Sequence, residues 1–115
     1  MEDKPKVLFV LEHHNPQYDP LPFSTAQTWV DDRGVDVVMW LMYDSIQIVR
    51  KDAIEQTPEI KAMIDDLLGK GVPIYVCGFC TRSCGLSAGD YYHGVAVGNR
   101  NIYFSMVTER KVVTY

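Results

Sequence analysis

Short, nearly continuous runs of apolar residues recur along the chain, separated by polar segments that are rich in turn-forming residues. Such runs are typical of strands buried on both faces of a sheet. The first run, Lys6–Leu11, breaks at a polar loop of about ten residues that contains several prolines. The predicted strands are Lys6–Leu11, 35–43, 72–77, 95–97 and 112–115.

Between these runs, apolar residues recur at helical spacing. Ser24 is a candidate N-cap for a helix at 25–32 that ends before Gly34, and Thr57 followed by Pro58 is a typical start for a helix that ends at Gly69. Residues 44–56 are ambiguous, and their apolar side chains suggest a partly helical loop that faces a partner. The predicted helices are 25–32, 58–68, 78–85 and 101–109.

Strands that alternate with helices imply right-handed crossovers and a parallel sheet covered on both faces. The predicted fold class is therefore α/β, a three-layer α/β/α sandwich with a mainly parallel five-stranded sheet. A length of 115 residues fits one domain, 1–115, with no internal repeat or linker.

Composition narrows the range of partners. The net charge is −4 and no run of Lys and Arg is present, so we expect no nucleic-acid partner. No stretch approaches the roughly 20 apolar residues that span a bilayer, so we expect no membrane association. The first apolar run is too short for a signal peptide. We therefore expect a cytoplasmic location, where thiols stay reduced.

Three cysteines lie within eight positions, which is not a disulfide framework. Cys77 ends a predicted strand, at the edge where parallel sheets bind their ligands, and Gly78 leaves its thiol uncovered. A helix that begins after Cys77 directs free N–H groups at the sulfur, which favours the nucleophilic thiolate. Arg82 on that helix is a candidate binding residue that adds positive charge, and Cys80 is a candidate second thiol.

Other interpretations of the cluster remain open. The cysteines pack as small apolar side chains in one of them. In another, Cys77, Cys80 and Cys84 share one helix face and ligate zinc or an iron–sulfur cluster, with His93 or His13 completing the shell.

Further candidate binding residues follow the first two predicted strands and the cysteine helix. His13 and His14 follow the first strand and Asp44 the second, which places them at the same sheet edge as Cys77. A histidine at that edge can accept the proton of a cysteine. His93 follows the cysteine helix.

Several apolar side chains outside the predicted strands suggest a surface for subunit contact. These are Tyr18, Phe23, Ile46, Ile48 and Val49.

The segment 71–86 resembles the core of the DsrE/TusD-like sulfur-relay family. In that family a strand ends in a cysteine, a short helix follows, and a glycine comes eight residues after the cysteine, as Cys77 and Gly85 do here. The likeness extends over nearly the whole chain as pattern and topology. It includes Gly69–Lys70–Gly71 after the preceding helix, the strand beginning at Gly94–Val95, and the final segment 111–115.

The resemblance implies a DsrE-like fold and a cytoplasmic oligomer, often a trimer or a hexamer, that needs no cofactor. It implies that Cys77 accepts a sulfane sulfur from a donor protein as a persulfide and passes it to an acceptor protein. Cys80 and Cys84 stand where relay members usually have small or basic residues, which leaves room for an internal disulfide or a metal.

Three functions therefore remain. The leading one is a sulfur carrier, sulfurtransferase-like if it is an enzyme, that uses Cys77 and Cys80. The second is a metal-binding or regulatory module built on all three cysteines. The third is a non-catalytic subunit of a hetero-oligomer.

Overall fold

The computed structural model describes residues 4–115. Within this range five parallel strands form one sheet in the order β4-β3-β2-β1-β5. The strands are β1 (Lys6–Leu11), β2 (Asp36–Leu41), β3 (Ile74–Cys77), β4 (Ala96–Gly98) and β5 (Lys111–Thr114). The helices are α1 (Pro20–Arg33), η1 (Tyr43–Val49), α2 (Lys51–Ile54), α3 (Pro58–Gly69), α4 (Gly78–Ser83), η2 (Ala88–Asp90) and α5 (Arg100–Glu109), of which η1 and η2 are 3₁₀ helices.

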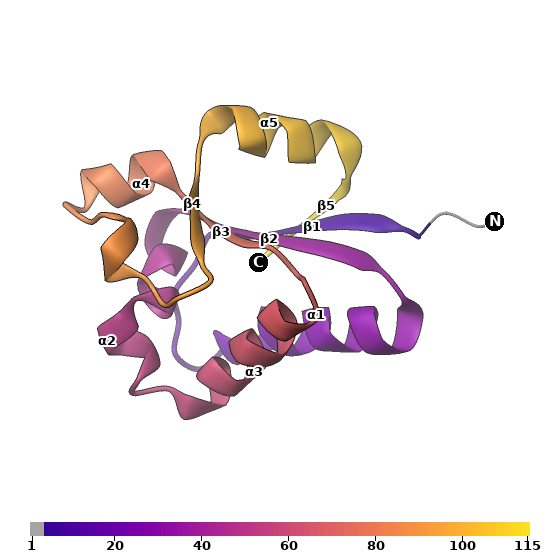
Figure 1. Cartoon of the computed structure of the whole chain (residues 1–115), viewed down its shortest axis with the longest axis horizontal. Helices are drawn as coiled ribbons and strands as arrows, with labels where there is room; N and C mark the ends of the chain where they lie inside the picture. Colours follow the sequence, from indigo (N-terminus) through magenta and orange to yellow (C-terminus); the bar gives the residue numbers. More distant parts are fainter. Residues whose placement is uncertain (1–3) are drawn as a thin grey trace.

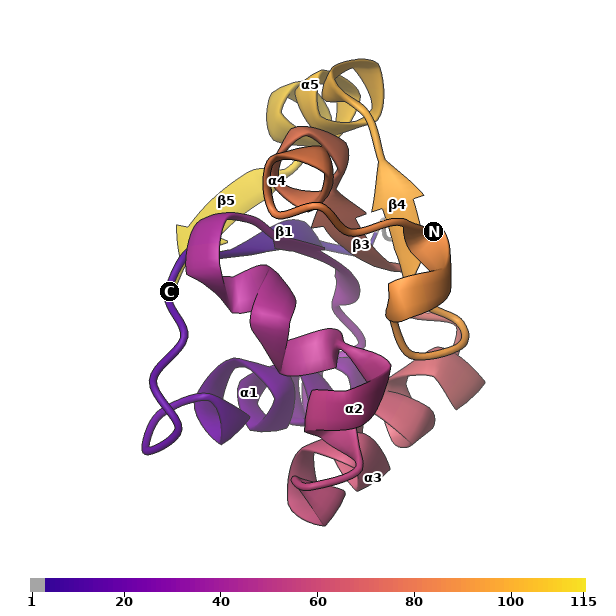
Figure 2. The same cartoon turned by 90° about the vertical axis from the view of Figure 1, so that its left-hand side faces the viewer.

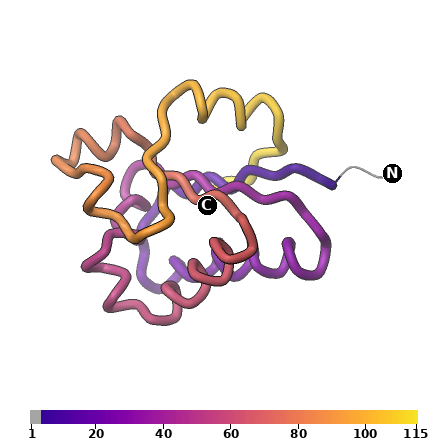
Figure 3. Tube along the Cα trace, in the orientation of Figure 1, coloured from indigo at the N-terminus to yellow at the C-terminus, as the bar shows by residue number. Residues whose placement is uncertain are grey.

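The sheet is the middle layer of a sandwich. Helices α1 and α3 cover one face and α5 covers the other (Figure 1), while α4 lies at one end of the sheet, on the same side as α5 (Figure 2). The chain steps from β1 across to β4, and α5 then carries it back over the sheet to β5, a path that the Cα trace makes easy to follow (Figure 3). The predicted α/β sandwich with a parallel five-stranded sheet is confirmed.

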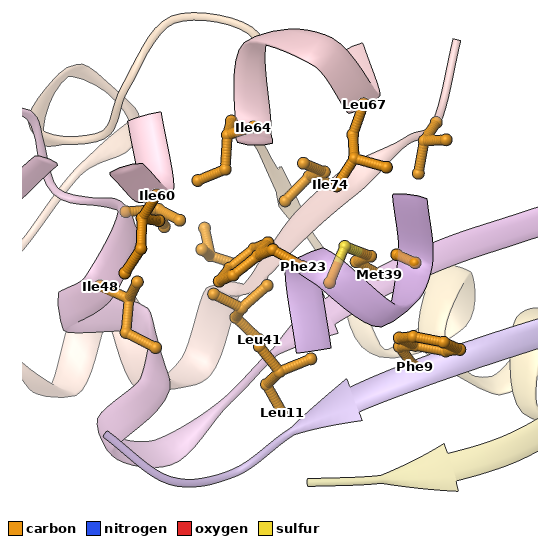
Figure 4. Packing of buried hydrophobic residues seen from close by; sticks show 14 of the residues in the cluster. Phe9, Leu11, Phe23, Met39, Leu41, Ile48, Ile60, Ile64, Leu67 and Ile74 are labelled. Carbon is orange, nitrogen blue, oxygen red and sulfur yellow. The ribbon is translucent and has the colours of Figure 1, made fainter. Parts of the chain in front are cut away.

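Alternation along the strands divides the core in two. Val7, Phe9 and Leu11 of β1 point into a large cluster between the sheet and helices α1 and α3, part of which is seen from close by in Figure 4. The intervening β1 residues point to the opposite face. There they join a smaller group, here named the α5 cluster, made of Leu8, Val10, Val38, Trp40 and Met106. Each face of the sheet is thus sealed by its own apolar layer.

The first helix begins earlier than its sequence pattern predicts. Helix α1 starts at Pro20 instead of near residue 25, and Ser24 is not its N-cap. The prolines at 20 and 22 were expected in the preceding loop. Proline is well tolerated in the first turn of a helix, where its missing N–H has no intrahelical partner to lose.

The predicted subunit-contact surface is wrong for four of its five residues. Phe23 is fully buried in the large cluster from α1, and η1 folds Ile46 and Val49, also fully buried, and Ile48, 4% exposed, into the same cluster. Only Tyr18 remains exposed. The segment 44–56 is therefore partly helical, as predicted, but its apolar side chains face the chain's own core instead of a partner.

Among residues 4–115, no helix has both the length and the apolar character that crossing a bilayer requires.

Candidate functional site

Cys77 lies at the junction of β3 and α4. It is the N-cap of α4, and its Sγ accepts a hydrogen bond from the backbone N–H of Cys80 at 3.4 Å. The hydroxyl of Thr81 donates to the carbonyl oxygen of Cys77 at 2.7 Å, and the same hydroxyl lies 2.7 Å from that of buried Tyr91. The backbone on both sides of the thiol is thus fixed, and the half-buried sulfur sits against the first turn of a helix.

Two glycines let this junction pack against the end of β4. A Cβ on Gly78 would lie 2.6 Å from the carbonyl oxygen of Gly98, and a Cβ on Gly98 would lie 2.4 Å from the Trp40 ring. Both separations are far shorter than a van der Waals contact. The absence of side chains at these positions allows α4, β4 and the indole to meet beside Cys77.

Cys80 lies one turn along α4 and faces the end of β2. Its Sγ accepts a hydrogen bond from the backbone N–H of Tyr43 at 3.2 Å. Burial raises the pKa of the Cys80 thiol; the Tyr43 hydrogen bond opposes this rise and the neighbouring Cys77 sulfur adds to it. Tyr43 has a φ of 56°, in the left-handed region that non-glycine residues rarely adopt. Such backbone strain tends to occur at functional sites.

The three sulfur atoms have different surroundings. Cys77 packs against the α5 cluster, whereas Cys80 packs against the large cluster on the other side of the sheet. Cys84 follows α4 and is exposed. The predicted sharing of one helix face by all three cysteines is therefore wrong, because α4 covers only Gly78–Ser83: Cys80 lies within it, whereas Cys77 is its N-cap and Cys84 its C-cap.

A pocket of about 660 Å³ opens beside Cys77, between α4 and the start of α5. Its apolar wall comes from Trp40, Met42, Phe79 and Tyr103, with Gly78 and Gly98 at the contact between helix and strand. Its polar rim is made of Arg82, Asn99, Arg100 and Asn101. This volume lies within the range of small-molecule sites in proteins.

Of the candidate binding residues named from sequence, Arg82 alone lines this pocket with Cys77. His13 lines a separate cavity of about 310 Å³ together with Leu11 and Tyr115. His14 instead bonds through Nδ1 to the buried carboxylate of Asp19 at 2.6 Å.

The two remaining candidates also lie outside the pocket. Asp44 is exposed in the first turn of η1, next to Tyr43. His93 is exposed and its ring packs against that of Tyr92, with 4.2 Å between the ring centroids. Neither side chain lines the pocket that holds Cys77.

The α5 side of the pocket was missed in the sequence. Asn99 caps α5 by accepting a hydrogen bond from the N–H of Ile102 at 2.9 Å, and Arg100 is the first residue of that helix. Asn at a position before an apolar-periodic segment is a recognisable N-cap signal. With the β4-to-β5 crossover, that signal would have placed the start of α5 at the edge of the sheet where Cys77 lies.

Within residues 4–115, no group of three or more His, Cys, Asp and Glu side chains is arranged to hold a metal ion. The donor set beside Cys77 also suits a metal poorly, since the side chains that line the pocket with it are guanidinium, amide and apolar groups.

Solved structures from three organisms share this architecture. MTH1491 from Methanobacterium thermoautotrophicum, a protein of unknown function, gives a TM-score of 0.82 at 18% identity, covering 97% of this chain and 100% of that one. The ychN protein from E. coli gives 0.75 at 21% identity, covering 98% and 100%. BT1422 from Bacteroides thetaiotaomicron, of unknown function, gives 0.74 at 14% identity, covering 96% and 94%.

Curated proteins give no match to this sequence. The family comparison is decisive, because the match extends over residues 6–112, from the start of β1 into β5. It agrees with the resemblance that the spacing of Cys77 and Gly85 suggests. The chain belongs to the DsrE/DsrF-like family.

Proposed function

We propose that the protein is a sulfur carrier in which Cys77 accepts a sulfane sulfur as a persulfide and passes it to an acceptor. The observation that carries the proposal is the position of the Cys77 sulfur, half-buried on the wall of a pocket and hydrogen-bonded to the first turn of α4. A backbone N–H that donates to sulfur favours the thiolate, which is the nucleophile in sulfur exchange. Membership of the DsrE/DsrF-like family supports the same chemistry.

The transfer needs no separate acid and base. The Cys77 thiolate attacks the outer sulfur of a donor persulfide, R–S–SH; the new S–S bond forms on Cys77 and the donor leaves as the thiolate R–S⁻. Delivery reverses the step, as an acceptor thiolate attacks the outer sulfur and Cys77 leaves as a thiolate. Both steps are two-electron exchanges at sulfur with no net oxidation.

Cys80 gives the carrier a second outcome. Because it lies one turn from Cys77, with the Cys77 sulfur close enough to affect its pKa, it can attack the inner sulfur of the persulfide. The outer sulfur then leaves as sulfide, and a Cys77–Cys80 disulfide remains. Renewed loading then requires a thiol reductant, which the cytoplasm supplies, and we place the protein there.

Intact-mass measurement after incubation with a low-molecular-weight persulfide tests the proposal. The wild-type protein should gain the mass of one sulfur atom and lose it on reduction. Cys77→Ser should gain none, whereas Cys84→Ser, which removes an exposed thiol outside α4, should load like the wild type. Equal loading of Cys77→Ser and wild type would exclude Cys77 as the acceptor.

A further inference from the structure

The rim of the Cys77 pocket carries positive charge without a matching carboxylate. Arg82 reaches it from α4 and Arg100 from the start of α5, and no Asp or Glu lines it. Among residues 4–115, these two exposed guanidinium groups have no ion pair or hydrogen bond to a protein group, whereas those of Arg50 and Arg110 do. In a chain with a net charge of −4, two unpaired guanidinium groups beside one nucleophile are a local exception.

Both arginines line the pocket that holds the Cys77 thiol, Arg82 from the helix that follows Cys77 and Arg100 from α5. The Nη1 of Arg82 lies 3.4 Å from where a Cβ on Gly78 would be, so the guanidinium folds back over the residue next to Cys77. On the α5 side, Asn99 uses its Oδ1 for the N-cap, which leaves its amide nitrogen as a donor at the rim. Guanidinium forks and amide N–H groups match the geometry of an oxyanion.

The wall of the pocket is largely aromatic. The Trp40 side chain, which is 2% exposed, forms part of it. The neighbouring aromatic side chains of Tyr103 and Phe79 give the same pocket a surface for an apolar group.

We propose that this pocket binds a small sulfane-sulfur donor by an oxyanion group, namely thiosulfate or an organic thiosulfonate, R–SO₂–S⁻. This proposal rests on the proposed function, to which it adds the class of donor. The Cys77 thiolate attacks the outer sulfur, a Cys77 persulfide anion forms, and the S–S bond to the sulfonyl group breaks. The leaving group is sulfite from thiosulfate or a sulfinate from the thiosulfonate, and Arg82 and Arg100 hold its oxygens throughout.

The positive rim can be tested without sulfur transfer. Iodoacetate and iodoacetamide alkylate the same thiolate but differ in charge, so the ratio of their rates at Cys77, measured by peptide mapping, reports anion binding at the rim. In the Arg82→Gln/Arg100→Gln double variant this ratio should fall about fivefold, as expected for the loss of a modest charge attraction. Arg33→Gln, at the end of α1, removes a positive charge away from the pocket and should keep the wild-type ratio.

The donor class is tested by persulfide formation on wild type and the double variant with thiosulfate and, separately, with benzenethiosulfonate. Loading by at least one of the two should be about tenfold slower in the double variant, and the faster donor identifies the source of the oxyanion. Faster loading by benzenethiosulfonate would assign a role to the aromatic wall. Equal loading and an unchanged alkylation ratio in the double variant would overturn the proposal.

The two proposals fail in different ways. Suppose that neither oxyanion donor loads Cys77, but the Arg82→Gln/Arg100→Gln double variant still accepts sulfur from a low-molecular-weight persulfide. The carrier function then stands and the oxyanion donor is rejected. If no donor of any class loads Cys77 while the alkylation ratio responds to both arginines, the sulfur-carrier function is rejected and only the anion-binding rim stands.

Discussion

The backbone N–H of Tyr43 donates a hydrogen bond to the Sγ of Cys80 over 3.2 Å and thereby ties together segments 37 residues apart in the sequence. The donor lies at the start of η1, which follows β2, and the acceptor lies in α4, which follows β3. The ends of two neighbouring strands thus converge on the second thiol. Its environment is set by the fold of the sheet edge as much as by its own helix.

This environment predicts the pH at which Cys80 reacts. Burial raises the pKa of its thiol, so at neutral pH it should remain protonated and alkylate more slowly than Cys77 and exposed Cys84. Its labelling rate should rise as the pH is made alkaline. Peptide mapping after limiting iodoacetamide at a series of pH values measures this order. Labelling of Cys80 before the other two thiols at neutral pH would contradict it.

A second prediction concerns the lifetime of the persulfide. If Cys80 attacks the Cys77 persulfide, Cys80→Ser should lengthen the lifetime of the loaded protein and abolish the internal disulfide. Cys84→Ser is the matched control, since it removes a thiol that lies outside α4. Intact mass followed over time gives both quantities. Equal lifetimes in wild type and Cys80→Ser would show that Cys80 packs against the core without acting on the persulfide.

A third prediction tests the contact between β4 and the indole. Gly98→Ala should destabilise the protein by about 1–3 kcal/mol, the usual cost of forcing extra volume into a packed site, because its Cβ would overlap the rigid Trp40 ring. Gly89→Ala is the control, since a Cβ there meets nothing within 4 Å. Urea unfolding of both variants measures the difference. A Gly98→Ala variant as stable as Gly89→Ala would mean that Trp40 moves without cost.

A fourth prediction links Tyr92 to alkaline unfolding. Its hydroxyl donates to the Oδ1 of Asp65 at 2.6 Å, and this bond, followed by burial, raises the pKa of Tyr92 to about 12 from 10.0. A folded-state pKa above the unfolded one contributes stability that is complete below pH 10 and is lost as the pH rises towards 12. Tyr92→Phe should therefore flatten the fall in stability over this interval, which denaturant unfolding at several pH values can measure. An unchanged slope would rule out this hydrogen bond as its cause.

We also predict a homo-oligomer, a trimer or a hexamer. With the η1 residues buried, the strongest remaining apolar candidates on the pocket side are Phe79 of α4, 72% exposed, and Phe104 of α5, 69% exposed. Light scattering should give a mass that is a multiple of 13.1 kDa, and Phe104→Asp should lower it. Leu21→Asp, an exposed position on α1 at the opposite face of the sheet, serves as the control. A wild-type monomer at micromolar concentration would reject the prediction.

The sheet and the position of Cys77 could be predicted because both depend on local pattern. Continuous apolar runs predicted the start and end of each strand to within two residues. Parallel strands also place their carboxyl ends at one edge of the sheet. The burial of Ile46 and Val49 could not be predicted in the same way. Their segment has no regular apolar period, and these side chains are buried because the segment packs against the large cluster.

The pocket shows the same limit. Arg82 is near Cys77 in sequence and could be proposed, whereas Arg100 and Trp40 reach the site only because α5 crosses back over the sheet and Gly98 admits the indole. The histidines illustrate the converse. His13 and His14 do follow a strand at the correct edge, but the loop that carries them turns towards α1, where Asp19 binds His14.

The sulfur atoms of Cys77 and Cys80 lie against different layers of the fold, so the two thiols report separately on local opening. Cys77 contacts the layer under α5, and Cys80 contacts the layer that faces α1 and α3. If α5 lifts while the rest of the fold persists, labelling should accelerate at Cys77 and stay unchanged at Cys80; an opening of the α1 and α3 side should reverse the pattern. Thiol labelling under native conditions would thus measure local opening separately on the two faces of the sheet, with the natural cysteines as the labelled sites.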